Sequence, residues 1–218
     1  MKRVLVSVEG QTEETFIRDV LRDYLHPLDI HLIPSIVNTK IVKDGPNFKG
    51  GLINYQRARR DIQKLLTDSN AVAVTTFYDL YGLPTDFPGY DTRPPQPYAK
   101  VNHLETEFSN DINHSRFRPY LQLHEFETFL FVEPDTTSQM LGLGESEANE
   151  LSGIRSRFSN PEEINDDPLT APSIRLQSIY DAYEKVLDGP LVTLELGLSQ
   201  LRQACQHFDA WVTWLEGL

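Results

Sequence analysis

Acidic side chains follow three short apolar runs of this chain. These acids are Glu9, Asp79, and the pair Glu125 and Glu127. If the runs are strands of one parallel sheet, their carboxyl ends meet at a single edge, where such sheets bind ligands. Carboxylates that close cannot all stay ionised unless a cation neutralises them. Mg2+ prefers carboxylate oxygens and completes its shell with water and phosphate oxygens, so these residues indicate phosphoryl or phosphodiester chemistry.

The first of these acids lies where a predicted strand passes into a predicted helix. Residues 4–8 are apolar and rich in β-branched side chains, which is typical of a buried strand. Gly10 allows a sharp turn directly after Glu9. Thr12 can cap the helix that follows, and Glu13 in its first turn suits the positive end of the helix dipole. Packing explains Glu9 poorly, so we interpret it as functional, whereas helix capping is a simpler alternative for Glu13.

Alternating apolar and polar segments predict the remaining elements. Strands are expected at residues 4–8, 30–37, 71–78 and 118–123. Pro34 indicates that the second strand lies at an edge or is irregular. Helices are expected at residues 52–66, 98–112, 140–158 (one or two), 173–187 and 194–218 (two short ones), besides those that begin near Thr12 and Phe126.

The order of these elements predicts the fold class. Strands are concentrated in the first 130 residues, and helices dominate the remainder. We therefore predict an α/β fold, with a mostly parallel sheet flanked by helices in residues 1–133. A helical C-terminal extension, residues 134–218, is expected to pack on this core as part of one compact unit. The long loop at residues 80–97, which is rich in proline, is expected to be functional.

Composition narrows the class of protein further. The chain has 218 residues and a formal net charge of -12, which is unlike the basic footprint of a generic nucleic-acid binder. The single Cys205 excludes a disulfide framework and a cysteine-rich zinc site. No apolar run approaches the roughly 20 residues of a membrane-spanning helix, and no secretory signal is recognisable at the N-terminus. We expect a cytoplasmic protein without membrane partners.

Several motifs, taken in order, resemble the Toprim domain of topoisomerases, DnaG-type primases and OLD-family nucleases. More specifically, they resemble a largely uncharacterised prokaryotic group of Toprim-like proteins. The motifs are Glu9-Gly10-x-Thr12-Glu13-Glu14, Tyr78-Asp79-x-Tyr81-Gly82 and Gln122-x-His124-Glu125-Phe126-Glu127, with further matches at residues 161–165, 171–176 and 205–208. The resemblance spans nearly the whole chain and implies a Toprim-like fold.

The resemblance also implies roles for the acids. Glu9 matches an acid that serves as general acid/base or metal ligand, and Glu13 matches a second catalytic acid of OLD-type nucleases. Asp79 matches a metal ligand. A further ligand matches Glu125 or Glu127, and spacing does not choose between them. The implied catalytic set is Glu9, Glu13, Asp79 and Glu127, and the implied ligands of Mg2+ or Mn2+ are Glu9, Asp79, Glu125 and Glu127.

Basic residues are the candidates for contacts with substrate. Arg57 and Arg60 lie in the densest basic group of the chain, on the predicted helix 52–66. This group is either a solvated helix face or a surface that meets phosphates. The relatives also use a distal basic residue, for which Arg175 and Lys185 are the candidates. No glycine-rich nucleotide-binding motif is present, so any ATP would be used by a partner.

One departure from the Toprim pattern leaves the function open. Where the usual pattern is Asp-x-Asp, the third position here is Tyr81. The leading interpretation is a Mg2+- or Mn2+-dependent nuclease that cleaves DNA or RNA. The resemblance adds a role in anti-phage defence beside an ATPase partner. One alternative is a catalytically degenerate effector or adaptor that docks on an ATPase. Another is a metal-dependent phosphohydrolase acting on a small phosphorylated molecule.

Overall fold

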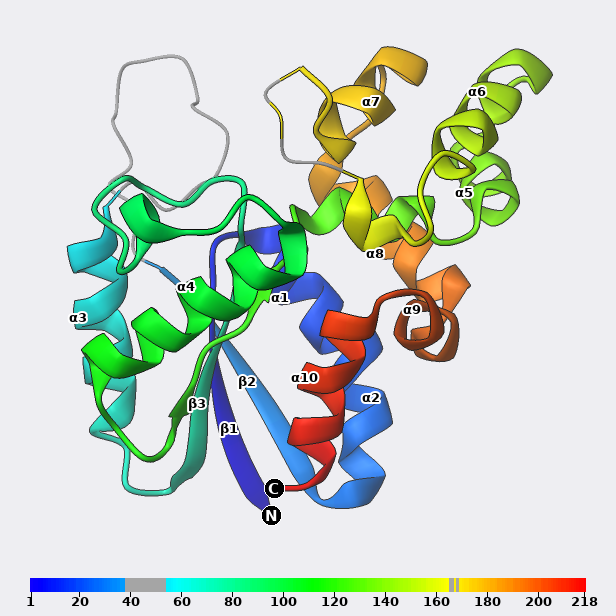
Figure 1. The fold of residues 1–218 in the computed structure, drawn as a ribbon. Helices are drawn as coiled ribbons and strands as arrows, with labels where there is room; N and C mark the ends of the chain where they lie inside the picture. Colours follow the sequence, from blue (N-terminus) through cyan, green and yellow to red (C-terminus); the bar gives the residue numbers. More distant parts are fainter. Residues whose placement is uncertain (38–53, 165–166, 168) are drawn as a thin grey trace, which may run out of the picture.

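The computed structural model describes residues 1–37, 54–164, 167 and 169–218 (Figure 1). Its centre is a five-stranded sheet in which the pairings are parallel. The strand order is β2-β1-β3-β4, and β5 also pairs with β3. The strands are β1 (Lys2–Val8), β2 (Ile30–Ile36), β3 (Ala71–Asp79), β4 (Phe117–Arg118) and β5 (Leu121–Gln122). The predicted α/β fold with a mostly parallel sheet is therefore confirmed.

Both faces of the sheet are covered by helices, as expected for parallel strands (Figure 1). Val4 and Phe77 belong to a core that includes residues of α1 (Gln11–Phe16) and α10 (Gln206–Glu216). Their neighbours Leu5 and Tyr78 point to the other face, where they join a core formed with α3 (Tyr55–Leu66) and α4 (Pro97–Ile112). This alternation follows from the two-residue period of strand side chains.

Short helical segments make up the remaining regular structure. The first helix continues from α1 through a π-helical turn (Ile17–Leu21) into α2 (Arg22–Leu25) and a 3-10 turn (His26–Leu28). Other 3-10 turns lie at Tyr90–Thr92, Phe126–Phe131 and Pro161–Glu163. The C-terminal helices are α5 (Pro134–Leu141), α6 (Glu145–Arg155), α7 (Pro172–Ile179), α8 (Lys185–Leu196), α9 (Leu198–Ala204) and α10. Within the described residues, no helix is both long and apolar enough to cross a membrane.

The edge position predicted from Pro34 is confirmed, because among the described strands β2 pairs with β1 alone. The single strand predicted at residues 118–123 is wrong in detail, since β4 and β5 are two separate strands. Pro119 has no N–H to donate to a ladder. Tyr120 N–H instead donates to Oγ1 of Thr76 at 2.9 Å, and Thr76 Oγ1 donates to the Tyr120 carbonyl at 2.8 Å. Between β4 and β5, hydrogen bonds from the Thr76 side chain to the backbone of Tyr120 thus replace the backbone ladder with β3.

The helix predicted at residues 173–187 is also wrong, because α7 ends at Ile179 and α8 begins at Lys185. The backbone N–H of Glu184 donates to Oδ2 of Asp188 at 2.7 Å, and this contact fixes the start of α8. Ile174 in α7 and Val186 in α8 are both exposed. Of the helix predicted at 52–66, residues 52 and 53 lie outside the described residues.

Aromatic side chains from both predicted parts of the chain pack in one core. The ring centroids of Phe16 and Phe129 lie 5.4 Å apart, and that of Phe208 in α10 lies 4.9 Å from that of Phe129. Trp211 in α10 donates its indole N–H to Oγ1 of Thr75 in β3 at 3.0 Å. The C-terminal helices thus contribute to the core that supports the sheet. The division between residues 133 and 134 stays a prediction.

Candidate metal centre

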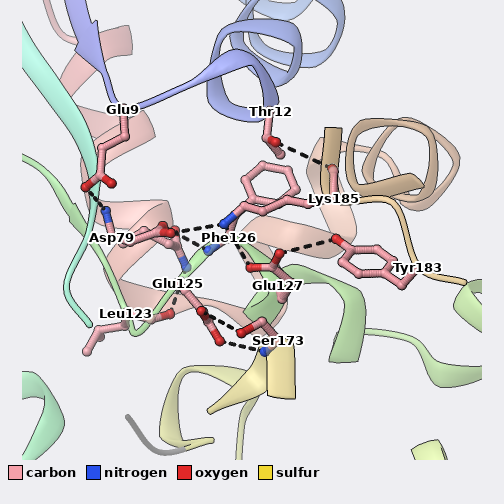
Figure 2. Close-up of polar contacts among 11 residues, drawn as sticks. Glu9, Thr12, Asp79, Leu123, Glu125, Phe126, Glu127, Ser173, Tyr183 and Lys185 are labelled. Carbon is pink, nitrogen blue, oxygen red and sulfur yellow. Dashed lines mark hydrogen bonds and ion pairs between the residues drawn. The ribbon is translucent and has the colours of Figure 1, made fainter. Parts of the chain in front are cut away.

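Three carboxylates gather where the central strand β3 and the short strand β5 end (Figure 2). Asp79 is the last residue of β3, and Glu125 and Glu127 follow β5 closely in the chain. One oxygen from each of the three lies within 4.8 Å of the others. Glu125 and Glu127 are 6% and 0% exposed. The parallel arrangement of β3 and β5 therefore brings these acids together, as expected for neighbouring parallel strands.

Asp79 is fixed by contacts to both of its carboxylate oxygens. The backbone N–H of Phe126 donates to Oδ1 at 3.0 Å, and the ammonium group of Lys185 donates to Oδ2 at 3.2 Å. Burial raises the pKa of Asp79 above its ordinary value, Lys185 acts in the opposite direction, and Glu127 raises it further. The start of the 3-10 turn at Phe126 thus holds Asp79 against the other two acids.

Glu125 is held by the first turn of α7. Both its oxygens accept hydrogen bonds from Ser173, one from the backbone N–H at 2.5 Å and one from the hydroxyl at 3.0 Å (Figure 2). Burial, followed by the charges of Glu127 and Asp79, raises the pKa of Glu125 to about 7. The carboxyl group therefore titrates near neutral pH, and its position depends on a helix far away in the sequence.

Glu127 is the most buried member of the group. Its Oε2 accepts from Lys185 at 3.2 Å, and its Oε1 accepts from the hydroxyl of Tyr183 at a longer 3.4 Å. Both donors belong to the segment at the start of α8. Glu125 and Glu127 thus both lie next to Asp79, and both stay in the predicted ligand set.

Glu9 and Glu13 lie beside this group and do not belong to the set of three. Oε1 of Glu9 accepts from the backbone N–H of Asp79 at 2.9 Å, so Glu9 braces the end of β3. Burial, Asp79 and Glu13 raise the pKa of Glu9 well above its ordinary value. Glu13 is 3% exposed, and burial followed by the charge of Asp79 raises its pKa to about 7. Glu9 and Glu13 thus add two buried carboxyl groups next to the set of three.

Lys185 supplies positive charge to the site from the first residue of α8. Burial disfavours its charged form, but the charges of Asp79 and Glu127 outweigh this and raise the pKa of Lys185 well above its ordinary value. The hydroxyl of Thr12 in α1 donates to the Lys185 carbonyl at 3.4 Å. The packing of α8 against α1 therefore places a protonated amine between two of the three carboxylates.

The other predicted basic residues lie in different places. Arg57 and Arg60 belong to α3, which packs on the face of the sheet opposite to the core that contains α8 residues. Arg175 donates to the carbonyl of Thr170 at 2.6 Å, and its guanidinium lies 5.7 Å from the ring centroid of Phe158. Their roles in substrate binding stay predictions.

Tyr81 is 40% exposed, and its backbone N–H donates to the carbonyl of His124 at 2.8 Å. The position two residues after Asp79 therefore supplies a main-chain contact and no carboxylate.

The sequence-based prediction of the site does not include Ser173 and Tyr183, which contact the acids. Pro172 before Ser173 does signal a helix start, because proline is favoured in the first turn. Nothing local to that helix indicates that its first turn meets Glu125.

Comparisons with known proteins place the chain in a family without assigning it an activity. Among solved structures, the chain is similar to the "C-terminal region of the Burkholderia pseudomallei OLD protein" at 15% sequence identity and a TM-score of 0.41. That match covers 97% of this chain and 99% of the other. No curated protein sequence matches the chain. The model of the family described as "Domain of unknown function (DUF4276)" matches residues 8–216, so the chain belongs to this family.

Proposed function

We propose that this protein is a Mg2+- or Mn2+-dependent nuclease that hydrolyses phosphodiester bonds in DNA or RNA. The observation that carries the proposal is the grouping of Asp79, Glu125 and Glu127, whose oxygens lie within 4.8 Å of one another. Carboxylate oxygens are the preferred protein ligands of Mg2+ and Mn2+. The grouping lies at the carboxyl ends of parallel strands, the edge at which open α/β sheets bind ligands.

The charges of the site fit a divalent cation. Three ionised carboxylates and one protonated Lys185 carry a formal charge of -2. A dication would balance this charge, and it would also favour the ionised form of Glu125, whose pKa is about 7. When bound, such an ion polarises a phosphate oxygen and lowers the pKa of a coordinated water.

The remaining residues of the site suit proton transfer and charge stabilisation. Glu13 has a pKa of about 7, so it can hold or release a proton at neutral pH. Glu9 is also protonated more readily than an ordinary glutamate and lies against the backbone of Asp79. In the proposal, Glu9 or Glu13 exchanges a proton with the attacking water or the leaving oxygen, and Lys185 meets the charge of the phosphate.

A second candidate is a catalytically degenerate effector. Two observations favour it: Tyr81 stands where the Toprim pattern has a second aspartate, and Lys185 already pairs with Asp79 and Glu127. An internal ammonium group can neutralise buried carboxylates without a metal. In that case the acids and Lys185 form a structural network, and the protein acts by binding its partner.

The proposal includes an ATPase partner and a role in anti-phage defence, which rest on the motif resemblance alone. The formal net charge of -12 supports the idea that another protein delivers the substrate, since an acidic surface repels nucleic acid. The third hypothesis for the same site is a metal-dependent phosphohydrolase that acts on a small phosphorylated molecule.

Cleavage assays test the proposal directly. Plasmid DNA, single-stranded DNA and tRNA are incubated with the protein in Mg2+, in Mn2+ and in EDTA. We expect metal-dependent cleavage of at least one substrate, and a loss of about 100-fold or more in Asp79→Asn and Glu9→Gln. Glu150→Gln, at an exposed acid of α6, is the matched control and should retain activity. Cleavage that persists in EDTA or in Asp79→Asn would overturn the proposal.

A further inference from the structure

Helix α8 presents a row of leucines to solvent. Leu187, Leu191 and Leu194 are 56%, 46% and 52% exposed. Their spacing of four and three residues puts them on one face of the helix, so they form a continuous stripe. Val186, 51% exposed, extends the apolar surface at the start of the helix. We call Leu187, Leu191 and Leu194 the α8 stripe.

The opposite face of α8 is already buried in the protein. Val192 and Leu196 are 1% and 3% exposed and belong to the core that contains Phe16 and Phe208. A helix that is apolar on both sides is normally buried on both sides. Contiguous apolar surface on a folded protein commonly marks a contact with another protein or a membrane. The α8 stripe is therefore a candidate docking surface.

Acidic residues border the stripe along one side. Glu184 and Glu195 are exposed and Asp188 is half-buried. At 100° per residue all three lie on the same side of the line of leucines. The only basic residue of α8 is Lys185, and its ammonium group is directed to Asp79 and Glu127. The border of the stripe therefore carries negative charge.

We propose that α8 docks a helix of a partner protein, one with an apolar stripe bordered by lysine or arginine. Such a helix would bury the leucines and pair its cations with Glu184, Asp188 and Glu195. A second copy of this chain fits less well, because it brings the same acids and another formal charge of -12. An anionic lipid surface fits less well for the same reason.

This inference does not depend on nuclease activity. It does concern the helix that supplies Lys185 to the carboxylate group, so a docked partner would contact the element that carries this cation.

Synthetic peptides provide the probe. One is an amphipathic helix with leucines spaced like the α8 stripe and with lysine and arginine along one border, and the other replaces those cations with glutamate. Binding to the full-length chain is measured by fluorescence anisotropy at about 0.15 M ionic strength, so that weak screened attraction does not dominate. We expect the basic peptide to bind and the acidic peptide not to bind.

The variant Leu191→Glu separates docking from general charge attraction. It adds a negative charge, which alone would strengthen binding of a basic peptide, but it interrupts the stripe. We expect it to weaken binding about tenfold or more. Leu169→Glu adds the same charge at a leucine that is 82% exposed in a loop, and it should bind like the wild type. Equal affinity of Leu191→Glu and the wild type, or of the two peptides, overturns the proposal.

Sedimentation and vesicle binding address the other occupants. Sedimentation velocity of the wild type should show a monomer at all concentrations used. A concentration-dependent dimer that disappears in Leu191→Glu would assign the stripe to a second copy and overturn the proposal. Binding to phosphatidylserine vesicles that is lost in the same variant would assign it to a membrane, with the same consequence.

Discussion

The ammonium nitrogen of Lys185 lies 3.2 Å from Oδ2 of Asp79, although the two residues are 106 positions apart in the chain. Asp79 ends the central strand β3, and Lys185 begins helix α8. The contact therefore joins the sheet to the C-terminal helices at the point where the three carboxylates gather. Lys185 therefore links the charge of the site to the packing of the C-terminal helices.

Replacing Lys185 with methionine should destabilise the protein when metal is absent. The change leaves Asp79 and Glu127 buried without their cation while keeping the length of the side chain. We expect a loss of about 1–3 kcal/mol in EDTA, less than for a fully buried pair because the Lys185 side chain is 39% exposed. Urea unfolding with EDTA and with Mn2+ measures this, and Mn2+ should restore most of the loss.

The exposed pair of Arg18 and Asp19 provides the control for that experiment. Arg18→Met removes one cation from a surface ion pair, so its stability should match the wild type in both conditions. If Lys185→Met is as stable as Arg18→Met in EDTA, Lys185 does not compensate the acids.

Glu13 should make stability depend on pH. Its pKa is about 7 in the folded protein and 4.5 as an ordinary side chain, so the folded state holds a proton that the unfolded state has lost. Stability therefore falls as pH rises from about 4.5 to about 7, by roughly 3 kcal/mol for this group. Glu13→Gln cannot ionise, so it should be more stable than the wild type at pH 8 and not at pH 4.5.

Urea unfolding at pH 4.5, 6 and 8 measures the difference. Glu14→Gln, which removes the adjacent, half-buried acid of the same helical turn, is measured beside it as the matched change of charge. Parallel curves for Glu13→Gln and the wild type would show that Glu13 does not titrate as its burial indicates.

His207 should also lower the stability as pH rises, but because its charged form makes a favourable contact that is lost on deprotonation. Its Nε2 lies 2.9 Å from Oε1 of Glu105, which also accepts from the backbone N–H of Leu121 at 2.8 Å. Burial lowers the pKa of His207, but the hydrogen bond and charge of Glu105 outweigh it, so the net shift is upward from 6.5. The added stability is complete below pH 6.5 and is lost as pH rises through the folded pKa.

We therefore expect His207→Gln to cost about 1–2 kcal/mol at pH 6 and clearly less at pH 9, measured by urea unfolding. The comparison between the two pH values is its own control, because the lost packing of the imidazole is the same at both. An equal cost at pH 6 and pH 9 would mean that His207 acts only through packing.

Local sequence patterns predict most of the sheet. The β-branched run before Glu9 and the run that ends at Asp79 are β1 and β3, because both faces of these strands are buried. The break between β4 and β5 has a local signal in Pro119, but the contact that replaces the ladder comes from the hydroxyl of Thr76, 44 residues from Tyr120 and outside any window around residues 118–123. The start of α8, by contrast, has a local signal, because Asp188 accepts from the backbone N–H of Glu184 only four residues earlier.

The acids of the site are predictable from their positions in the sheet, whereas Lys185 is expected only through the motif resemblance. Asp79, Glu125 and Glu127 are expected together because parallel strands end at one edge. The place of Lys185 depends on how α8 packs on α1, and the contact of Ser173 with Glu125 depends on a helix 48 residues away. Periodicity describes which side of a helix is buried, but it does not say which distant residue that helix meets.

Calorimetric titration with Mn2+ at pH 8, where Glu13 and Glu125 are ionised, tests the central claim most directly. We predict saturable binding to the wild type and an affinity at least about tenfold lower in Asp79→Asn and Glu127→Gln, each of which removes one ligand. Glu150→Gln should bind Mn2+ like the wild type. Absence of saturable binding to the wild type, or equal affinity in Asp79→Asn, would contradict the assignment of these carboxylates as a metal centre.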